Sequence, residues 1–311
     1  MKKISIIIPY HGEPKESVLP LMLSLNAQKN IDFNDIEILI NNDSENDYIS
    51  DIIECCDNIK NICTLTNYNG GGPGPSRQHC LDNAQGEYVL FFDADDTFLT
   101  NSDVSKILNI VASGFDVYNF VMAWETFENE KLKYQMWGRN LMSLCGKAYR
   151  LQFLLENNIK LLPELKHYGE DQYFNLILNS CFPKEYTMSL VTYVYTVNTT
   201  QYCKPGLSKI SNNKNNSPHD IVRPLQRAYE FISKKIDIEL CRKDISLFIY
   251  LLYDDYFNKN FTEETKKIMR QDMRKFIQDF DPTLKCINLI TFKNNNPVPF
   301  KEFVETLINN Y

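Results

Sequence analysis

The sequence predicts an α/β protein in which helices flank a central sheet, followed by a helical C-terminal region. Short apolar runs rich in β-branched residues alternate with helical patterns over the N-terminal third, which is typical of a parallel, doubly wound sheet. Polar and acidic side chains follow directly after several of these runs. From about residue 220 onward the strand patterns stop and helical patterns take over.

Four apolar segments of the N-terminal third are predicted strands, at residues 3–9, 36–40, 62–66 and 87–92. Helical apolar spacing connects them, at residues 17–28, 48–56 and 76–84. The first strand stops at Pro9, which has no amide hydrogen for the sheet ladder. Because strands joined by helices run parallel, their carboxyl ends are expected to meet at one rim of the sheet, where α/β proteins bind ligands.

The second half of the chain is predicted to add further strands and then helices. Strands are expected at residues 116–122 and 189–197, a hairpin or loop at 131–142, and helices at 104–113, 152–157 and 170–181. The Asn-, Ser-, Gly- and Lys-rich run 204–217 is typical of a mobile loop. The C-terminal helices are expected at 221–235, 239–257, 263–279 and 300–309. We therefore predict two domains, residues 1–217 and the helical region 218–311.

Composition excludes several classes of protein. With 43% hydrophobic residues among 311, the chain can bury a sizeable core, which excludes wholesale disorder. The formal net charge of -7 disfavours a generally basic nucleic-acid binder. No apolar run approaches the ~20 residues that span a bilayer. The nine cysteines show no paired ligand spacing and no signal peptide is evident, so reduced thiols and a cytoplasmic location are expected.

The acidic run that closes the fourth predicted strand carries the strongest chemical signal. Asp93, Asp95 and Asp96 follow the apolar run 87–92 directly. Carboxylates gathered at a strand end repel one another and therefore call for a cation, and oxygen ligands suit Mg²⁺ or Mn²⁺. The alternative is a helix N-cap, because Asp caps helices well. A cap needs one Asp, so three in four positions favour metal or phosphate chemistry.

A glycine-rich loop stands between the second and fourth strand ends. Residues 69–78 contain four of the eleven glycines of the chain, and such a loop lets backbone approach a ligand closely. Arg77, at the start of the following helix, has the planar guanidinium that binds phosphate or ribose oxygens. The loop lacks the Gly-Lys-Ser/Thr ending of a Walker A motif. The alternative is an ordinary Gly-Pro turn.

Taken in order, these segments resemble the nucleotide-sugar domain of family 2 glycosyltransferases. The motifs are a strand ending in Pro-Tyr-x-x-Glu, then Asn-Asn-Asp-Ser, then Gly-Gly-Pro-Gly-x-x-Arg-Gln, then Gly-Glu-Tyr-Val-Leu-Phe-Phe-Asp-Ala-Asp-Asp. The resemblance covers roughly residues 3–200. It implies the GT-A fold, a Rossmann-like mixed sheet flanked by helices, and transfer of a sugar from a nucleotide diphosphate sugar to a hydroxyl acceptor. The loop 69–78 also resembles that of phage-encoded members.

The resemblance assigns the metal to the acidic run. Asp95 and Asp93 match the family's Asp-x-Asp motif, which implies that they hold Mn²⁺ or Mg²⁺ on the sugar diphosphate, with Asp95 as the direct ligand. Asp93 is also expected to contact the ribose, and Asp96 to orient the site.

The nucleotide pocket is implied by the other strand ends. Pro9, Tyr10 and Glu13 match the residues that line it, His11 stands where an Asn is commoner, and Arg77 matches an Arg near the nucleotide. Asn42 stands where an Asp often accepts a hydrogen bond from uracil. An amide both donates and accepts, so a UDP-sugar is the favoured donor while the base stays open.

A second acidic pair opens the predicted helix 170–181. Glu170 and Asp171 resemble the family's Glu-Asp motif, which implies that Asp171 is the catalytic base of an inverting reaction, supported by Glu170. A positioned carboxylate can take the proton of an attacking alcohol. The alternative is that acidic residues simply favour a helix N-terminus.

Three further sets of residues are weaker candidates. The segment Gly-Lys-Ala-Tyr-Arg resembles one that precedes the base in the family, so Lys147 or Arg150 is a candidate contact for diphosphate or acceptor. Aromatic side chains stack on sugars, which makes Trp124 and Trp137 candidates, although burial in the core is the favoured interpretation. A late His is a metal ligand in some GT-A enzymes, but an exposed His beside a helix start is favoured for His219.

The acceptor and two other functions stay open at this point. Polysaccharide or glycoconjugate acceptors are favoured by family membership. A phage enzyme acting on hydroxymethylated DNA bases would need a basic face, for which the candidates are Lys234, Lys235, Arg242, Lys266, Lys267, Arg270 and Arg274. A nucleotidyltransferase shares the acidic metal ligands but would release pyrophosphate, and a non-catalytic sugar-binding protein would release nothing.

Overall fold

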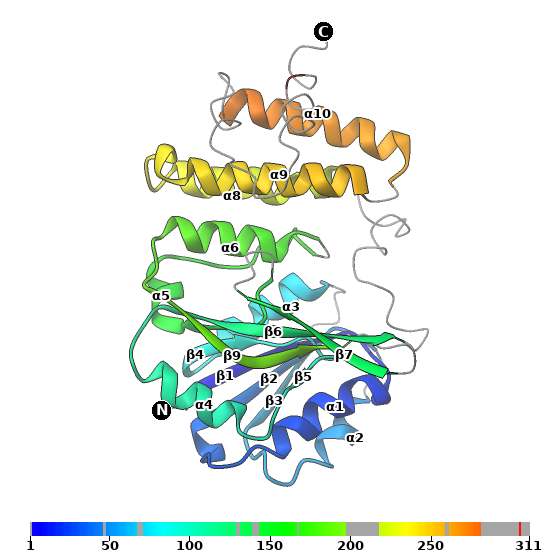
Figure 1. Cartoon of the computed structure of the whole chain (residues 1–311), viewed down its shortest axis with the longest axis vertical. Coiled ribbons are helices and arrows are strands. Elements are labelled where there is room, and N and C mark those ends of the chain that lie inside the picture. The colour runs from blue at the N-terminus through cyan, green and yellow to red at the C-terminus, as the bar shows by residue number, and fades with distance from the viewer. Residues whose placement is uncertain are drawn as a thin grey trace. The chain divides into compact units, whose positions relative to one another are not determined.

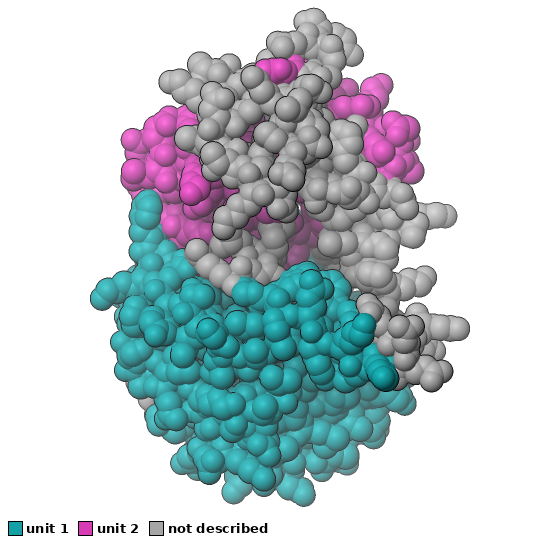
Figure 2. Space-filling model, in the orientation of Figure 1, with its two compact units in different colours: residues 1–167, 182–203 teal, residues 168–181, 204–311 magenta. Residues whose placement is uncertain are grey.

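The computed structural model describes residues 2–45, 48–66, 71–128, 131–138, 143–166, 168–196, 218–258, 261–280 and 305. The chain forms two compact units, shown in teal and magenta in Figure 2. The first comprises residues 1–167 and 182–203, and the second comprises residues 168–181 and 204–311. The predicted loop 204–217 lies outside the described residues, as does the predicted helix 300–309 apart from residue 305.

In its described residues the first unit is built on a nine-stranded mixed sheet with the order β3-β2-β1-β4-β8-β6-β9-β5, and β7 pairs with β6 (Figure 1). The four predicted N-terminal strands are present and run parallel to one another. They are β1 (Lys2–Tyr10), β2 (Ile36–Asn42), β3 (Ile62–Thr66) and β4 (Gly86–Phe91). Every residue of β2 is buried, as expected for a strand with both faces covered.

Helices cover both faces of this parallel half. They are α1 (Lys15–Asn26), α2 (Ile49–Ile53), α3 (Pro73–Asn83), α4 (Asp103–Val111) and α5 (Leu151–Glu156), with a single 3-10 turn η1 (Phe33–Asp35) before β2. Figure 1 shows α1 and α2 on one face of the sheet and α3 on the other. This sandwich confirms the α/β class and leaves the carboxyl ends of the strands as the rim.

The other half of the sheet contains antiparallel pairs, in agreement with the mixed sheet that the family resemblance implies. β8 (Lys147–Arg150) runs antiparallel to both β4 and β6 (Val117–Glu128). β9 (Glu185–Tyr195) is parallel to β6, while β7 (Lys131–Trp137) forms the predicted hairpin with β6. The two-residue β5 (Thr97–Phe98) pairs with the end of β9. The sequence analysis missed β5 and β8 because such short strands show no periodicity.

A buried polar network closes the amino-terminal end of the sheet. The Ser5 hydroxyl donates to Glu37 Oε1 at 2.5 Å and accepts from the Gly86 amide at 2.8 Å. Glu37 Oε1 also accepts from the Gln85 amide at 2.6 Å. A Cβ atom at Gly86 would lie 2.5 Å from the Ser5 backbone nitrogen. Only glycine therefore lets β4 approach β1 this closely.

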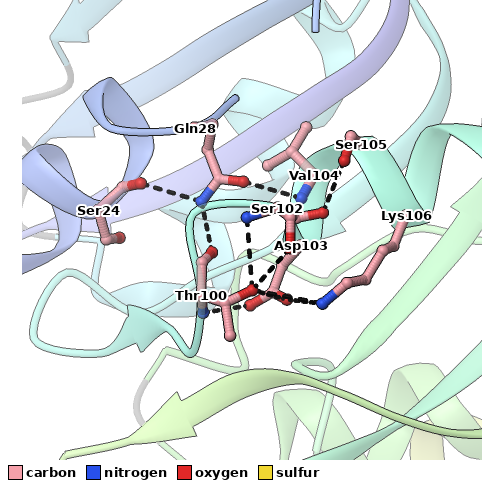
Figure 3. A network of polar contacts seen from close by, with 8 residues as sticks. All are labelled: Ser24, Gln28, Thr100, Ser102, Asp103, Val104, Ser105 and Lys106. Carbon is pink, nitrogen blue, oxygen red and sulfur yellow. Dashed lines mark hydrogen bonds and ion pairs between the residues drawn. The ribbon is translucent and has the colours of Figure 1, made fainter. Parts of the chain in front are cut away.

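A second network anchors the chain that follows the acidic run (Figure 3). The buried Gln28 side chain, after α1, donates to the Thr100 carbonyl at 2.9 Å and accepts from the Val104 amide at 3.0 Å. The fully buried Asp103 accepts from the Thr100 amide at 2.6 Å and pairs with Lys106 at 3.1 Å. These bonds fix the segment between the acidic run and α4 to the end of α1.

The second unit consists of helices. They are α6 (Glu170–Ser180), α8 (Arg223–Ser233), α9 (Arg242–Asn258) and α10 (Glu263–Phe280), with 3-10 turns η2 (Pro218–Ile221) and η3 (Ile238–Cys241). Its boundaries differ from the predicted division at residue 217, because α6 belongs to this unit. None of the helices in the described parts of the chain is both long and apolar enough to span a membrane.

The apolar side of α6 explains why it joins the C-terminal helices. A small enclosed space between α6, α8 and α9 is lined by Tyr173, Leu176, Leu225 and Phe248 among others. Gly169, just before α6, has φ +75°, and a Cβ atom there would lie 2.2 Å from Pro224 Cγ of α8. Close packing at this point therefore requires glycine.

Candidate active site

The carboxyl ends of three parallel strands lie side by side at the rim of the first unit. Pro9 and Tyr10 at the end of β1 pair with Asn41 and Asn42 at the end of β2. On the other side of β1, Ile7 pairs with Phe91, two residues before Asp93. The polar segments that the sequence analysis singled out are thus neighbours in space, as the strand-end rule predicts.

The loop after β1 is held by hydrogen bonds to one of its own residues, Glu13. The Tyr10 hydroxyl donates to the Glu13 carbonyl at 3.2 Å, and the His11 amide donates to Glu13 Oε2 at 2.7 Å. Burial raises the pKa of Glu13, and the charge of Asp95 raises it further. Glu13 and Asp95 therefore feel each other's charge across the rim.

Asp43 joins three of the loops, and the sequence analysis assigned it no role. Its side chain is 2% exposed, and Oδ1 lies 2.5 Å from Nδ1 of the largely exposed His11. Oδ2 accepts from the Gly72 amide at 3.0 Å and from the Ser76 hydroxyl at 3.3 Å. One buried carboxylate thus ties the β1 loop to the glycine-rich segment. The signals in the sequence were its place at a strand end and its place in the Asn-Asn-Asp-Ser motif.

The two asparagines at the end of β2 face different partners. The buried Asn42 accepts a hydrogen bond from the Ser44 amide through Oδ1 at 2.9 Å. That bond occupies one acceptor site of Asn42 Oδ1. Asn41 Oδ1 lies 2.7 Å from Nδ1 of His79 on α3, so His79 holds the helix against the strand end.

Arg77 and Asp93 form a half-buried ion pair. Arg77 Nη2 lies 2.5 Å from Asp93 Oδ1, and the two side chains are 5% and 34% exposed. α3 begins after Gly72, whose φ of +77° requires glycine, and Pro73 occupies its first turn, both of which suit a helix start. The start of α3 thus places the Arg77 guanidinium beside Asp93, the first aspartate of the acidic run.

Asp96 serves the architecture of the acidic run. It is 1% exposed and accepts hydrogen bonds from the Tyr193 hydroxyl of β9 and from the Thr196 amide, the latter at 2.9 Å. Burial raises the pKa of Asp96 well above its usual value, and the charges of Asp93 and Asp95 add to the effect. Asp96 thus holds the acidic run against β9 through hydrogen bonds. This gives the expected orienting role a physical basis.

The carboxylates of the rim suit a metal ion that also binds the phosphates of a substrate. Within the described ranges there is no group of three His, Cys, Asp or Glu side chains arranged to hold a metal ion. Asp93 bonds to Arg77 and Asp96 to Tyr193, while Asp95 is half-buried between them. Mg²⁺ typically uses one or two carboxylates together with substrate phosphates and water, and the rim fits that arrangement.

The two candidate cations, Lys147 and Arg150, lie at opposite ends of β8. Tyr88 and Val89 pair with Arg150 and Tyr149, so continuing the antiparallel register places Lys147 beside the end of β4. Lys147 is buried and donates to the Ser143 carbonyl at 2.9 Å. Arg150 lies toward the other end of β4 and its guanidinium binds the Asp116 carboxylate. Of the two, Lys147 lies at the rim end of the sheet.

Glu170, Asp171 and His219 belong to the second unit. Glu170 and Asp171 form the first turn of α6, as predicted, and Glu170 is buried. His219 lies in η2, with Nδ1 2.6 Å from Asp272 Oδ2 of α10 and its side chain 55% exposed. This agrees with the favoured interpretation of an exposed His beside a helix start.

Comparison with known proteins identifies the family. The model of glycosyl transferase family 2 matches residues 5–162, about half of the chain, and the chain belongs to this family. A relative from Haemophilus influenzae, described as an uncharacterized glycosyltransferase, is 28% identical over 69% of this chain and 84% of its own length.

TarS of Staphylococcus aureus, a poly(ribitol-phosphate) β-N-acetylglucosaminyltransferase, is 26% identical over 57% of this chain and 32% of its own length. The alignment thus spans about a third of TarS. The crystal structure of TarS residues 1–349 with UDP has a TM-score of 0.71 at 20% identity, covering 99% of this chain and 91% of that one. The expected GT-A-like fold is confirmed.

A more distant structure supplies a metal-bound example of the same fold. The mannosyltransferase PcManGT of Pyrobaculum calidifontis, solved with GDP-Man and Mn²⁺, has a TM-score of 0.52 at 10% identity, covering 98% of this chain and 84% of that one. Together with the family match, these likenesses establish the chain as a glycosyltransferase. The phage-encoded origin stays a prediction.

Proposed function

We propose that this protein is a metal-dependent, inverting glycosyltransferase that moves a sugar from a UDP-sugar to a hydroxyl acceptor of polysaccharide or glycoconjugate type. The observation that carries the proposal is the rim of the parallel sheet, where Glu13, Asp43, Asp93 and Asp95 converge with Arg77. The UDP complex of TarS, which has the same fold, favours uridine as the base.

In this proposal the strand-end residues divide the donor among them. Pro9, Tyr10, His11 and Glu13 line the nucleoside, and Asn42 presents its NH₂ group to a carbonyl of the base. Arg77 holds Asp93 in place for the ribose. Asp95, with Asp93, holds Mn²⁺ or Mg²⁺, and a cation bound there supplies Lewis-acid stabilisation of the diphosphate leaving group. Mn²⁺ in the complex of PcManGT supports this assignment.

The acceptor is activated by the acidic pair of the second unit. Asp171 takes the proton of the acceptor hydroxyl as it attacks the anomeric carbon, which inverts the configuration. The buried Glu170 supports the first turn of α6. The family resemblance of the Glu-Asp pair supports the assignment. A cytoplasmic location is also proposed, because the described cysteines are free thiols, which suits a reducing compartment.

Two measurements test the function. Titration calorimetry of UDP and GDP, each with Mn²⁺ and then with excess EDTA, should give UDP binding that the chelator weakens at least tenfold. Incubation of the enzyme with UDP-sugars should release UDP. Release of pyrophosphate instead would indicate a nucleotidyltransferase, and donor uptake indifferent to EDTA would refute the role of the metal.

A further inference from the structure

Both tryptophans of the chain lie in one aromatic cluster, with Tyr195 as its third member. The rings of Trp124 on β6 and Trp137 on β7 meet edge to face, with their centroids 4.6 Å apart. The ring of Tyr195 on β9 lies 4.9 Å from that of Trp124. Trp137 is 38% exposed, and Trp124 and Tyr195 are partly exposed. We call these three residues the aromatic platform.

Strand pairing places the platform on one face of the sheet, next to the acidic run. Trp124 pairs with Tyr195, and Met122 pairs with both Tyr193 and Trp137. Because side chains two residues apart share a face, the platform lies on the face that carries Tyr193. The Tyr193 hydroxyl and the Thr196 amide both donate to Asp96, so residues 193–196 link the platform to the candidate donor site.

The most exposed member of the platform, Trp137, lies outside the hydrophobic core. All of β7 is exposed. The same face also carries Gln135 directly opposite Trp124, and Lys133 opposite Thr126. Flat aromatic surfaces bordered by amide, hydroxyl and amino groups match a sugar ring, which has apolar C–H faces and hydroxyl groups around its edge.

The two faces of the hairpin differ in character. The opposite face of β7 carries Leu132, Tyr134 and Met136, which are 51%, 45% and 55% exposed, and there the described residues form no comparable ring cluster. A purely apolar partner, such as a lipid surface, would favour that second face. Mixed aromatic and hydrogen-bonding character favours a carbohydrate on the platform face.

From this juxtaposition we propose that the platform is a stacking subsite for a pyranose ring of the acceptor glycan. The proposal rests on the proposed glycosyltransferase function and extends it to the acceptor class, a cyclic saccharide. Trp137 stacks on the ring face, and Trp124, whose ring is inclined at 61° to that of Trp137, contacts the edge of the sugar. Gln135 and Lys133 bind its hydroxyl groups, and Tyr195 connects the subsite to the strand that holds Asp96. Trp137 is a positioning residue and takes no part in bond making.

Intrinsic fluorescence reports on this subsite alone, because the chain has no other tryptophan. The full-length protein is titrated with a tetramer of β-1,4-linked N-acetylglucosamine, and with ribitol as an acyclic polyol that has no ring face. We expect a saturable change in emission with the tetramer and none with ribitol. In Trp137→Ala, followed through Trp124, the dissociation constant for the tetramer should rise about tenfold, the size of one aromatic stacking contact.

Met136→Ala is the matched control, since Met136 is adjacent and exposed on the same strand but lies on the other face. It should bind the tetramer like the wild type. Equal weakening by both variants, or no saturable response to the tetramer, would overturn the proposal. A parallel UDP titration of the wild-type protein keeps the two hypotheses apart. If the wild-type protein does not bind UDP but still responds to the tetramer, the result contradicts the proposed donor site. It does not contradict the stacking subsite.

Discussion

The rim of the parallel sheet and the platform face of the β6–β7 hairpin belong to the same unit but are built differently. At the rim, buried side chains such as Asp43 and Asp96 hold loops together by hydrogen bonds to backbone amides. On the hairpin, β7 is exposed along its whole length and aromatic contacts dominate. A preorganised rim suits a constant ligand such as a nucleotide, whereas an exposed strand accepts substitution and suits a ligand that varies between relatives.

The largest effect should come from the metal ligand of the rim. Asp95→Ala should lower the transfer rate by about 10³-fold or more, because several kcal/mol of leaving-group stabilisation depend on the cation. UDP release from a UDP-sugar measures the rate, and calorimetry should show that Mn²⁺ no longer improves UDP binding. Glu87→Ala is the control, since it removes an exposed carboxylate at the opposite end of β4. Turnover by Asp95→Ala within tenfold of wild type would remove the rim from the mechanism.

A comparable loss is expected from the second unit, but with donor binding intact. Asp171→Asn should lower the rate of transfer by about 10²–10⁴-fold, the usual contribution of a general base, and should leave UDP affinity within about twofold. The combination separates a base from a donor ligand. Equal loss of UDP affinity, or a normal rate, would contradict the assignment. Gln172→Asn, one residue further along α6, provides the matched conservative change.

Asp43 tests whether the rim is as tightly preorganised as its contacts indicate. Asp43→Ala removes the buried carboxylate that accepts from the Gly72 amide and the Ser76 hydroxyl and leaves both donors without this partner. We expect a loss of about 2–3 kcal/mol in unfolding free energy, measured by urea denaturation, together with weaker UDP binding. Ser76→Ala removes only the longest of these bonds and should cost less than about 1.5 kcal/mol. Equal costs for the two variants would refute the central role of Asp43.

At the amino-terminal end of the same strands we expect the smallest effect on the transfer rate. The effect on stability there should be clear. Gly86→Ala places a Cβ atom 2.5 Å from the Ser5 nitrogen and 2.6 Å from the Ile4 carbonyl carbon, and should cost about 1–3 kcal/mol through overpacking. Gly138→Ala is the control, because a Cβ atom there meets nothing within 4 Å. Urea midpoints should separate the two variants, while UDP affinity stays near wild type in both.

Some features were accessible from sequence because each follows from local pattern. The apolar runs 36–40 and 62–66 became β2 and β3 with little change in their bounds, and the acidic pair 170–171 does open a helix. The tryptophans were predicted to lie in the core, whereas Trp137 is 38% exposed. That error arose because residue type alone does not distinguish an exposed hairpin from a buried strand.

The order of strands, acids and glycines along the chain was by itself enough to determine the α/β class, the family and the rim of the parallel strands. Only the tertiary structure decided that β8 runs antiparallel beside β4, that α6 packs with the C-terminal helices, and that Asp43 joins three loops. It also decided that two residues lie on the same face of β9: Tyr193, which binds Asp96 of the acidic run, and Tyr195, which belongs to the platform. The physical reason is that periodicity and strand-end chemistry are local, whereas pairing partners and buried hydrogen bonds join residues up to about a hundred positions apart.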